Sequence, residues 1–188
     1  VALDAASEEE LKLLALNALQ FSSPEQALPM LEQLLKSAQS IKLRERALFV
    51  LAQSGSPAAR KVMADVARQG NPDLQRKAID YLGVHGSTEN RALLAELYGP
   101  ADADVKRRIL RAYMVSGDRA RVLSAATSEP LPALREEAVR QLGVMGAREE
   151  LWQLYQKEST VEVKRQIVQA LFVGGDATRL IELANTEQ

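Results

Sequence analysis

The 188-residue sequence contains no cysteine and a single histidine, His85. Without cysteine the chain forms neither disulfides nor thiolate metal sites, although this suits an oxidising or a reducing compartment equally well. Only 4% of the residues are aromatic, and no stretch approaches the roughly 20 apolar residues that a membrane-spanning helix needs. Lys and Arg number 24 against 25 Asp and Glu, so net charge gives no general attraction to nucleic acid or to anionic membranes.

With 46% hydrophobic residues, the composition is typical of a soluble, all-helical protein. The chain begins at Val1, without an initiator methionine or a signal peptide. We therefore expect a segment of a longer polypeptide, in a compartment that the sequence does not specify.

A spaced glycine marks an internal repeat. The anchors Gly55, Gly86, Gly117, Gly146 and Gly175 stand at intervals of 31, 31, 29 and 29 residues, and Ser23 occupies the same context 32 residues before the first. The six anchors divide the chain into approximate repeats 7–39, 40–70, 71–101, 102–130, 131–159 and 160–188. A fixed period of this length is typical of a solenoid of stacked helical hairpins.

Four apolar columns recur before the anchors. At twelve residues before stand Leu11, Leu43, Leu74, Val105, Leu134 and Val163; at eight, Ala15, Ala47, Ala78, Ile109, Ala138 and Ile167; at seven, Leu16, Leu48, Ile79, Leu110, Val139 and Val168; at four, Leu19, Leu51, Leu82, Tyr113, Leu142 and Leu171. Spacings of four, one and three lie on one face of a helix. The columns therefore predict a first helix in each repeat, with this face buried.

A second helix is predicted after each anchor. Its buried residues are expected to be Val62, Met63 and Val66; Leu93, Leu94 and Leu97; Val122, Leu123 and Ala126; Leu151, Trp152 and Tyr155; and Leu180, Ile181 and Ala184. The last three sets begin two residues nearer to their glycine, which accounts for the shorter period. Because each anchor glycine follows a helix, we expect it to adopt positive φ or to permit a close helix approach.

Polar residues mark the predicted helix starts. First helices begin after Ser40, Asn71, Asp102 and Thr160, with Leu131 as the exception, and second helices begin after Ser56, Ser87, Asp118 and Asp176. These are residues preferred at helix N-caps. At the N-terminal end, residues 7–10 predict a capping box, Ser23 and Pro24 predict a helix start, and Pro29 predicts a kink.

The segments before the anchors carry a family resemblance. Residues 104–109 read DVKRRI, residues 162–167 read EVKRQI, and residues 134–146 read LREEAVRQLGVMG. They resemble HEAT repeats, and more closely the short bacterial HEAT-like repeats first associated with phycobilisome lyases. The resemblance covers about residues 7–187. It implies an all-α, right-handed superhelix with first helices on the convex face and second helices on the concave face.

The resemblance implies no single activity, because such repeats occur in lyases, hydroxylases, DNA-repair proteins and scaffolds. We expect a non-catalytic scaffold that binds a protein or peptide on its second-helix face. The candidate contact residues are the polar neighbours of the buried columns: Arg60, Lys61, Arg91, Arg121, Glu150, Gln153, Arg179 and Glu182.

Two sets of basic residues have alternative interpretations. One residue stands eleven before each anchor: Lys12, Arg44, Gln75, Lys106, Arg135 and Lys164. We interpret this column as packing at the repeat seam, paired with the acids two residues upstream, Glu10, Asp73, Asp104 and Glu162. A denser stripe on the middle first helices is the alternative site for an anionic partner such as nucleic acid: Arg76, Lys77, Arg107, Arg108, Arg111 and Arg140. No aromatic residues interleave with it for base stacking.

The sequence contains few residues in patterns that indicate an enzyme. HEAT-like hydroxylases of the deoxyhypusine type hold two irons with several His-Glu dyads, which a chain with His85 as its only histidine does not provide. No motif pairs a nucleophile with a base, so we expect no catalytic residue, metal or cofactor. A lyase-like or other HEAT-repeat enzyme subunit remains the alternative. Trp152 and Tyr155 are interpreted as core residues, with an aromatic anchor for a partner as the alternative.

The two ends of the repeat array are unusually apolar. Leu13 and Leu14 stand where the other repeats carry mostly charged residues, and Leu180, Ile181 and Leu183 lie in the last predicted helix. Terminal repeats of a solenoid normally need a polar outer face. We therefore expect further repeats on at least one side or self-association through these ends.

Overall fold

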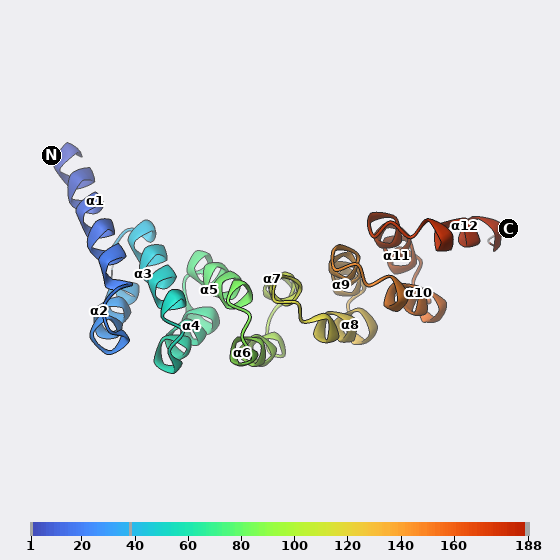
Figure 1. Ribbon diagram of the computed structural model, residues 1–188, viewed down its shortest axis with the longest axis horizontal. Coiled ribbons are helices and arrows are strands. Elements are labelled where there is room, and N and C mark those ends of the chain that lie inside the picture. Colours follow the sequence, from blue (N-terminus) through green and yellow to red (C-terminus); the bar gives the residue numbers. More distant parts are fainter. Residues whose placement is uncertain (1, 38, 187–188) are drawn as a thin grey trace. The chain divides into compact units, whose positions relative to one another are not determined.

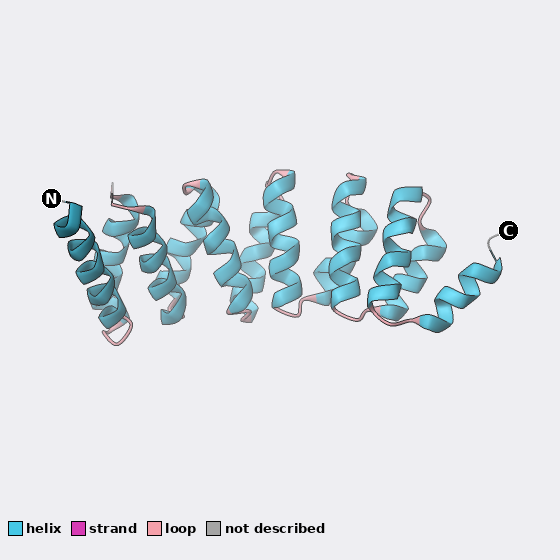
Figure 2. Cartoon of the chain, turned by 90° about the horizontal axis from the view of Figure 1, so that it is seen from above, coloured by secondary structure: helices cyan, strands magenta, loops and turns pink. Residues whose placement is uncertain are grey.

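The structure, a computed structural model, describes residues 2–37 and 39–186, and every regular element in these ranges is an α-helix (Figures 1 and 2). The helices of this described part are α1 (Ala2–Leu19), α2 (Pro24–Lys36), α3 (Ile41–Ser54), α4 (Pro57–Gln69), α5 (Pro72–Val84), α6 (Thr88–Tyr98), α7 (Ala103–Val115), α8 (Arg119–Ser128), α9 (Pro132–Val144), α10 (Arg148–Lys157), α11 (Val161–Val173) and α12 (Ala177–Thr186). The prediction of an all-α fold made of helical hairpins is confirmed.

The helices group into two compact units, Val1–His85 and Gly86–Gln188. In the first unit, the first helices α1, α3 and α5 pack side by side, and the second helices α2 and α4 form a second row against them. In the second unit, α7, α9 and α11 form the row of first helices, with α8 packed between α7 and α9 and α10 packed between α9 and α11. Each unit is thus a two-row stack in which a hairpin contacts its neighbours.

The apolar columns form the core between the rows. In the column eight residues before the anchor, Ala47, Ala78, Ile109, Ala138 and Ile167 are all 0% exposed. The column four residues before is buried in the same five repeats. Full burial of a leucine-sized side chain stabilises the fold by roughly 1.5–3 kcal/mol. The predicted buried face of the first helices is therefore confirmed from α3 onward, except at Val105 and Val168, which are half-buried.

The outermost helices depart from this pattern. Leu11 is 64% exposed and Ala15 is exposed, although both belong to predicted buried columns. At the other end, Ile181 is 63% exposed and Ala184 is exposed. The column prediction is wrong here because α1 packs on α3 and α12 packs on α11 from one side, so a face that is covered in the inner helices meets no next helix.

The buried face of the second helices is turned relative to the prediction. In α4 the buried residues are Ala59, Met63, Ala64 and Ala67, whereas Val62 and Val66 are half-buried. Leu93, Leu123, Trp152 and Leu180 are likewise half-buried. The alanines and Met63 of α4 thus form its buried face, and the branched valines are left on the neighbouring face.

The turn at the anchor glycine takes two forms. In the last three repeats it is a Schellman motif: the amide of Asp118 donates to the carbonyl of Tyr113 at 2.8 Å, and that of Gly117 donates to Met114 at 3.1 Å. Gly117 has φ of 73°, a conformation that glycine adopts without steric cost. Gly55, Gly146 and Gly175 also have positive φ.

At Gly86 the expectation of positive φ is wrong, because that glycine is not among those in the left-handed region. Helix α5 ends on His85, which caps it at φ of −92° and ψ of 50°. Helix α5 ends two residues before its anchor, as α7, α9 and α11 do, but the chain continues from His85 without a left-handed glycine. Ser87 then caps α6 by accepting the amide of Asn90.

The capping box predicted at residues 7–10 is also wrong. Helix α1 already begins at Ala2, so Ser7 and Glu10 lie inside it. The preceding segment contains Ala and Leu, which favour a helix, and Glu8 pairs with Lys12 one turn later at 2.7 Å. In α2, Ser23 occupies the N-cap position and Pro24 the first turn, as predicted, and the helix continues through Pro29.

Candidate functional site

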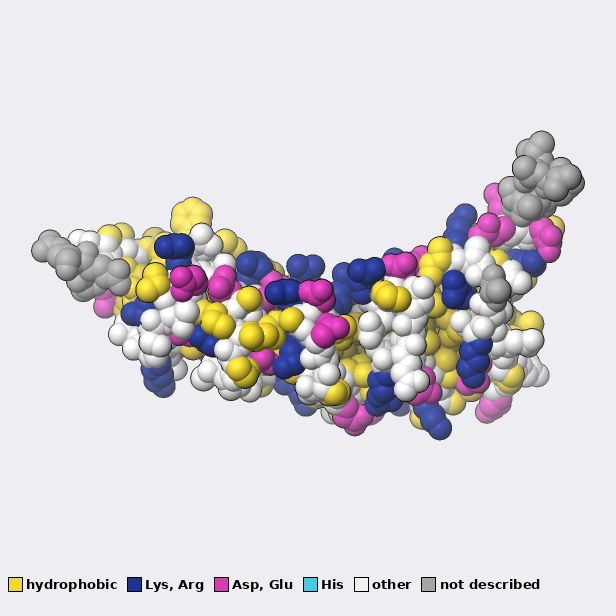
Figure 3. All heavy atoms as spheres, turned by 180° about the vertical axis from the view of Figure 1, so that it is seen from behind, with side chains coloured by type: hydrophobic (Ala, Val, Ile, Leu, Met, Phe, Trp, Pro, Cys, Tyr) yellow, Lys and Arg dark blue, Asp and Glu magenta, His cyan; other side chains and the backbone are white. Residues whose placement is uncertain are grey.

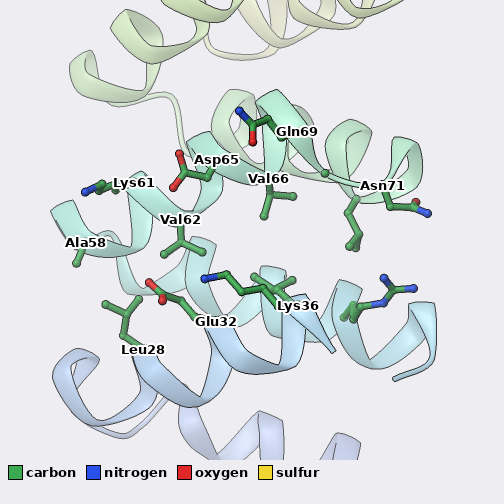
Figure 4. Close-up of a pocket in the computed structure, with 14 residues that line it drawn as sticks. Leu28, Glu32, Lys36, Ala58, Lys61, Val62, Asp65, Val66, Gln69 and Asn71 are labelled. Carbon is green, nitrogen blue, oxygen red and sulfur yellow. The ribbon is translucent and has the colours of Figure 1, made fainter. Parts of the chain in front are cut away.

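A groove of about 610 Å³ lies in the first unit, between the second helices α2 and α4 (Figure 4). Val62 and Val66 point from α4 toward α2, and Leu28 and Glu32 face them from α2. Lys61, one of the predicted contact residues, belongs to the same lining. The groove therefore combines apolar side chains with charged ones in its lining.

The half-buried valines are what opens this groove. Because α4 turns its alanines toward the core, the row Ala58, Val62 and Val66 is left facing the neighbouring second helix. The short side chains of this row leave space in front of Leu28 and Glu32 on α2. The groove is thus a consequence of the turned face of α4.

Arg44, on α3, lines the groove near the ends of α2 and α4. Its side-chain Nε is buried and has no hydrogen-bond partner among the described residues. Burying a guanidinium N–H without an acceptor is destabilising, and such groups are uncommon in native proteins. Arg44 is therefore an unusual member of the column eleven residues before the anchors.

Four other members of that column contact groups near the seams, whereas Lys12 pairs with Glu8 on its own helix at 2.7 Å. Lys106 binds Glu129 at 3.1 Å, and Arg135 binds Glu158 at 3.2 Å and the carbonyl of Glu129 at 2.9 Å. Gln75 donates to the carbonyl of Ala67 at 2.7 Å, and Lys164 lies 4.8 Å from the ring centroid of Tyr155. The seam-packing interpretation is confirmed for these four residues.

Their predicted acid partners are wrong. Asp73 pairs with Arg76 at 2.5 Å and Asp104 pairs with Arg107 at 2.6 Å. Side chains two residues apart on a helix do not face each other, whereas those three apart do. The acids at the helix starts thus pair along the outer surface, and the acids at the ends of α8 and α10 serve the seams.

The basic stripe is largely compensated by carboxylates. Besides the pairs of Arg76 and Arg107, Arg111 binds Glu137 at 3.3 Å and Arg140 binds the same carboxylate. Glu137 is buried and also accepts from Gln141 at 2.7 Å. Lys77 and Arg108 are half-buried. Figure 3 shows Lys and Arg interspersed with Asp and Glu on one face of the molecule.

Several predicted contact residues hold the turns between helices. Arg60 donates to the carbonyl of Gly55 at 2.7 Å, and Arg91 donates to that of Ser116 at 2.6 Å. Arg121 pairs with Asp118 at 2.5 Å, Glu150 pairs with Arg119 at 3.3 Å, and Gln153 donates to Glu149 at 3.2 Å. Arg179 pairs with Asp176 at 2.7 Å and with Glu149, and Glu182 is exposed. Of the set, Lys61 lines the groove.

The aromatic pair of the fifth repeat is built into α10. The rings of Trp152 and Tyr155 stack with centroids 6.0 Å apart and an interplanar angle of 4°. The guanidinium of Arg179 lies 5.8 Å from the Trp152 centroid. Tyr155 is buried, which confirms the core interpretation for that residue, whereas Trp152 is half-buried.

Two carboxylates at helix junctions have lowered pKa values. Burial opposes ionisation of Glu158, but hydrogen bonds from Thr160 and the guanidinium of Arg135 outweigh it and lower its pKa. The hydrogen bond from Arg179 is the main cause of the lowered pKa of Asp176. Both groups are acceptors at the ends of helices, so their ionisation serves the fold.

Within the described residues, no group of three or more His, Cys, Asp or Glu side chains is arranged to hold a metal ion. None of the helices described is long and apolar enough to cross a membrane.

Two features of the surface escaped the sequence analysis. The position two before the anchor carries Val84, Val115, Val144 and Val173, all of them exposed. Their recurrence is visible in the sequence, but the predicted columns did not include this position. The acids Glu129 and Glu158 were also missed, although each stands twelve residues after its anchor glycine.

Residues 28–114, from within α2 to within α7, match the family model described as HEAT repeats. A comparison with curated proteins gives no match. Together with the helical hairpins, the family match supports a HEAT-like repeat protein. It identifies HEAT repeats in general and does not select the phycobilisome-lyase type. The groove and Arg44 lie inside the matched region.

Proposed function

We propose that this HEAT-like repeat chain is a non-catalytic scaffold that binds a protein or peptide on its second helices. The observation that carries the proposal is the groove between α2 and α4, about 610 Å³ in volume. Repeat proteins of this type use the surface formed by successive repeats as an extended binding face. The groove is a place on that face where a partner can bury apolar side chains.

The lining of the groove suits a peptide chain. Apolar contacts come from Leu28, Val62 and Val66, and charged groups come from Glu32 and Lys61 in the same lining. Protein interfaces commonly combine an apolar centre with a polar rim, and a few anchor side chains contribute most of the binding free energy. An apolar side chain of the partner between the valines would be such an anchor.

The basic stripe is the less favoured interface. Arg76, Arg107, Arg111 and Arg140 already have carboxylate partners, and an anionic ligand would have to displace these acids. A nucleic-acid complex would also lose affinity steeply with salt, because binding releases condensed counterions. No observation favours a lyase or another enzymatic role.

The proposal is tested by selecting binders from a phage-displayed random peptide library with the full chain as bait. Hydrogen–deuterium exchange with a selected synthetic peptide is expected to protect amides of α2 and α4. The double variant Val62→Glu/Val66→Glu places charge in the groove and should abolish binding.

Val144→Glu is the matched control, because this exposed valine lies on α9 in the other unit and should leave affinity unchanged. A library that yields no enriched peptide, or peptides that protect neither α2 nor α4, would contradict the proposal.

A further inference from the structure

In the column eleven residues before the anchors, the repeat that contains Arg44 differs from the repeats that contain Lys106 and Arg135. Glu129 follows α8 directly as its C-cap, and Glu158 does the same for α10. These acids bind Lys106 and Arg135, respectively. Helix α4 instead ends at Gln69 with Gly70 as its C-cap. The repeat that contains Arg44 therefore lacks the acid that its counterparts use.

The chain's own groups leave this acid position empty. A Cβ on Gly70 would lie 2.4 Å from the carbonyl oxygen of Val66, so this backbone cannot carry a glutamate there without rearranging. Of the acids in the groove, Asp65 pairs with Arg68 at 3.7 Å. Glu32 makes no ion pair with Arg44 in the part of the chain that the structure describes.

The position of Arg44 connects this missing acid to the groove. The side chain lines the groove at the ends of α2 and α4, together with Gln69 and Asn71. A ligand that occupies the apolar part, between Val62 and Val66, extends toward Arg44 along the same opening. The Nε itself is buried and has no partner among the described residues, so an acceptor from outside would bind the part of the guanidinium that lines the groove.

We propose that the groove recognises an acidic peptide segment, in which an Asp or Glu carboxylate binds Arg44 and a neighbouring apolar side chain packs between Val62 and Val66. This inference rests on the proposed scaffold function and assigns its partner chemistry. The peptide carboxylate takes the role that Glu129 and Glu158 have elsewhere in the chain. Arginine suits it, because a guanidinium offers a planar pair of donors to a carboxylate.

The charges around the groove favour a carboxylate over a phosphate. Lys36, Arg44 and Lys61 carry positive charge in the lining, and Glu32 and Asp65 carry negative charge. The excess of one positive charge matches a single carboxylate. A phosphate carries about two negative charges at neutral pH and would meet the two acids of the lining. Selection of phosphopeptides over acidic peptides would overturn the inference.

The test uses the full chain and peptides selected from the random library. Isothermal titration calorimetry compares a selected peptide with its Glu→Gln or Asp→Asn isostere. The affinity is expected to fall about tenfold to a hundredfold, the range for losing a hydrogen bond to a charged group. Because the change is made in the peptide, this comparison is independent of how any protein variant folds.

Protein variants identify the guanidinium. Arg44→Gln copies the residue of the next repeat, Gln75, and should weaken the acidic peptide by the same factor while leaving the amide isostere unaffected. Gln69→Glu adds a carboxylate to the lining and should also lower the affinity for the acidic peptide. Lys42→Gln makes the same charge change as Arg44→Gln on α3 but outside this groove, and should change the affinity less than twofold.

The failures of the two proposals can be told apart. Selected peptides without acids, or equal affinity of Arg44→Gln and the unchanged chain for an acidic peptide, would overturn this inference while the scaffold proposal stands. A library without any enriched peptide overturns both. Loss of binding in Lys42→Gln equal to that in Arg44→Gln would show a general charge effect and also overturn the inference.

Discussion

At the scale of single residues, the seam between repeats depends on ion pairs that are shielded from water. The side chain of Glu129 is 7% exposed and that of Lys106 is 19% exposed. The ring of Tyr98 covers the ammonium group, with Nζ 5.0 Å from its centroid. Such a pair adds little net stability, but removing one partner leaves a buried charge uncompensated.

Lys106→Met is therefore expected to lower the free energy of unfolding by about 3 kcal/mol, because Glu129 would lose its partner. Urea denaturation followed by circular dichroism measures the change. The control is Arg107→Met, which breaks the exposed pair with Asp104 and should cost less than about 1 kcal/mol. Similar losses in the two variants would show that the seam pair is not special.

A second residue-scale prediction concerns pH. The folded state holds the pKa of Glu158 below its ordinary value of 4.5, so unfolding is accompanied by proton uptake at low pH. The stability from this group is complete above pH 4.5 and is lost as the pH falls through the folded pKa. Thermal melts between pH 7 and pH 3 should therefore show a smaller acid loss for Glu158→Gln than for the unchanged chain.

Glu162→Gln, at an exposed position in α11, is the comparison for that series and should keep the full acid loss. A Glu158→Gln variant whose melting temperature falls with acid as steeply as that of the unchanged chain would contradict the assignment.

At the scale of elements, the Schellman turn decides how the hairpins of the second unit close. A side chain at Gly117 would meet nothing within 4 Å, so space does not restrict this position. The restriction on this position comes from its positive φ of 73°. Gly117→Val should thus lower the free energy of unfolding by about 1 kcal/mol or more.

Gly99→Ala provides the contrast in urea denaturation. This glycine has right-handed helical angles, φ of −52° and ψ of −58°, and also has open space around it. The substitution should leave stability unchanged or raise it slightly. Equal effects at Gly99 and Gly117 would mean that backbone conformation is not the cause.

The closest approach between α9 and α11 depends on Gly143. A Cβ at this position would lie 2.9 Å from the Cβ and 3.0 Å from the Cα of Ala170. Gly143→Ala should therefore destabilise the second unit by about 1 kcal/mol or more, although alanine favours a helix more than glycine does.

A double-mutant cycle isolates that contact. In the variant Gly143→Ala/Ala170→Gly the contact between the two Cβ atoms is removed. The loss of stability in this double variant should therefore be smaller than the sum of the losses in the two single variants. Additive losses, measured by urea denaturation of all four proteins, would exclude helix approach as the origin.

At the scale of the whole molecule, apolar side chains are exposed on the first and last helices. Leu14 is 63% exposed on α1, beside Leu11, and Ile181 is exposed on α12. We expect concentration-dependent self-association through these faces, reduced by Leu11→Glu/Leu14→Glu because it places charge in the contact. Sedimentation velocity over a wide concentration range measures it. A chain that sediments as a monomer throughout would contradict the expectation.

Much of the fold could be predicted from the sequence, because each first helix repeats the same apolar columns. Ala78 and Ile167 are 89 residues apart in the chain and are equally buried. The periodic pattern predicts which face of a helix is apolar but not whether another helix covers that face. The prediction of burial was therefore wrong at Leu11 and Ile181. At Gly86 the chain leaves α5 through His85 without a positive-φ glycine, and the glycine shared by the repeats did not distinguish this turn from the others.

The candidate site was less predictable. Lys61 was expected to be a contact residue, but the groove depends on Val62 and Val66, which were expected to be buried. That outcome follows from alanines on the opposite face of α4, whose small size matters only after packing. The missing partner of Arg44 is a difference between repeats, and it becomes visible when Glu129 is seen to bind Lys106.

The Schellman junctions also bear on how the second unit responds to a mechanical load. Asp118 is shared by two helices: its amide bonds to the end of α7, and its carboxylate accepts the amide of Arg121 at the start of α8. Neither helix can be peeled away without loosening the other. A chain pulled from its ends would therefore yield in hairpin-sized steps. Each step would release 29 residues, the spacing from Gly117 to Gly146, or about 100 Å of extended chain.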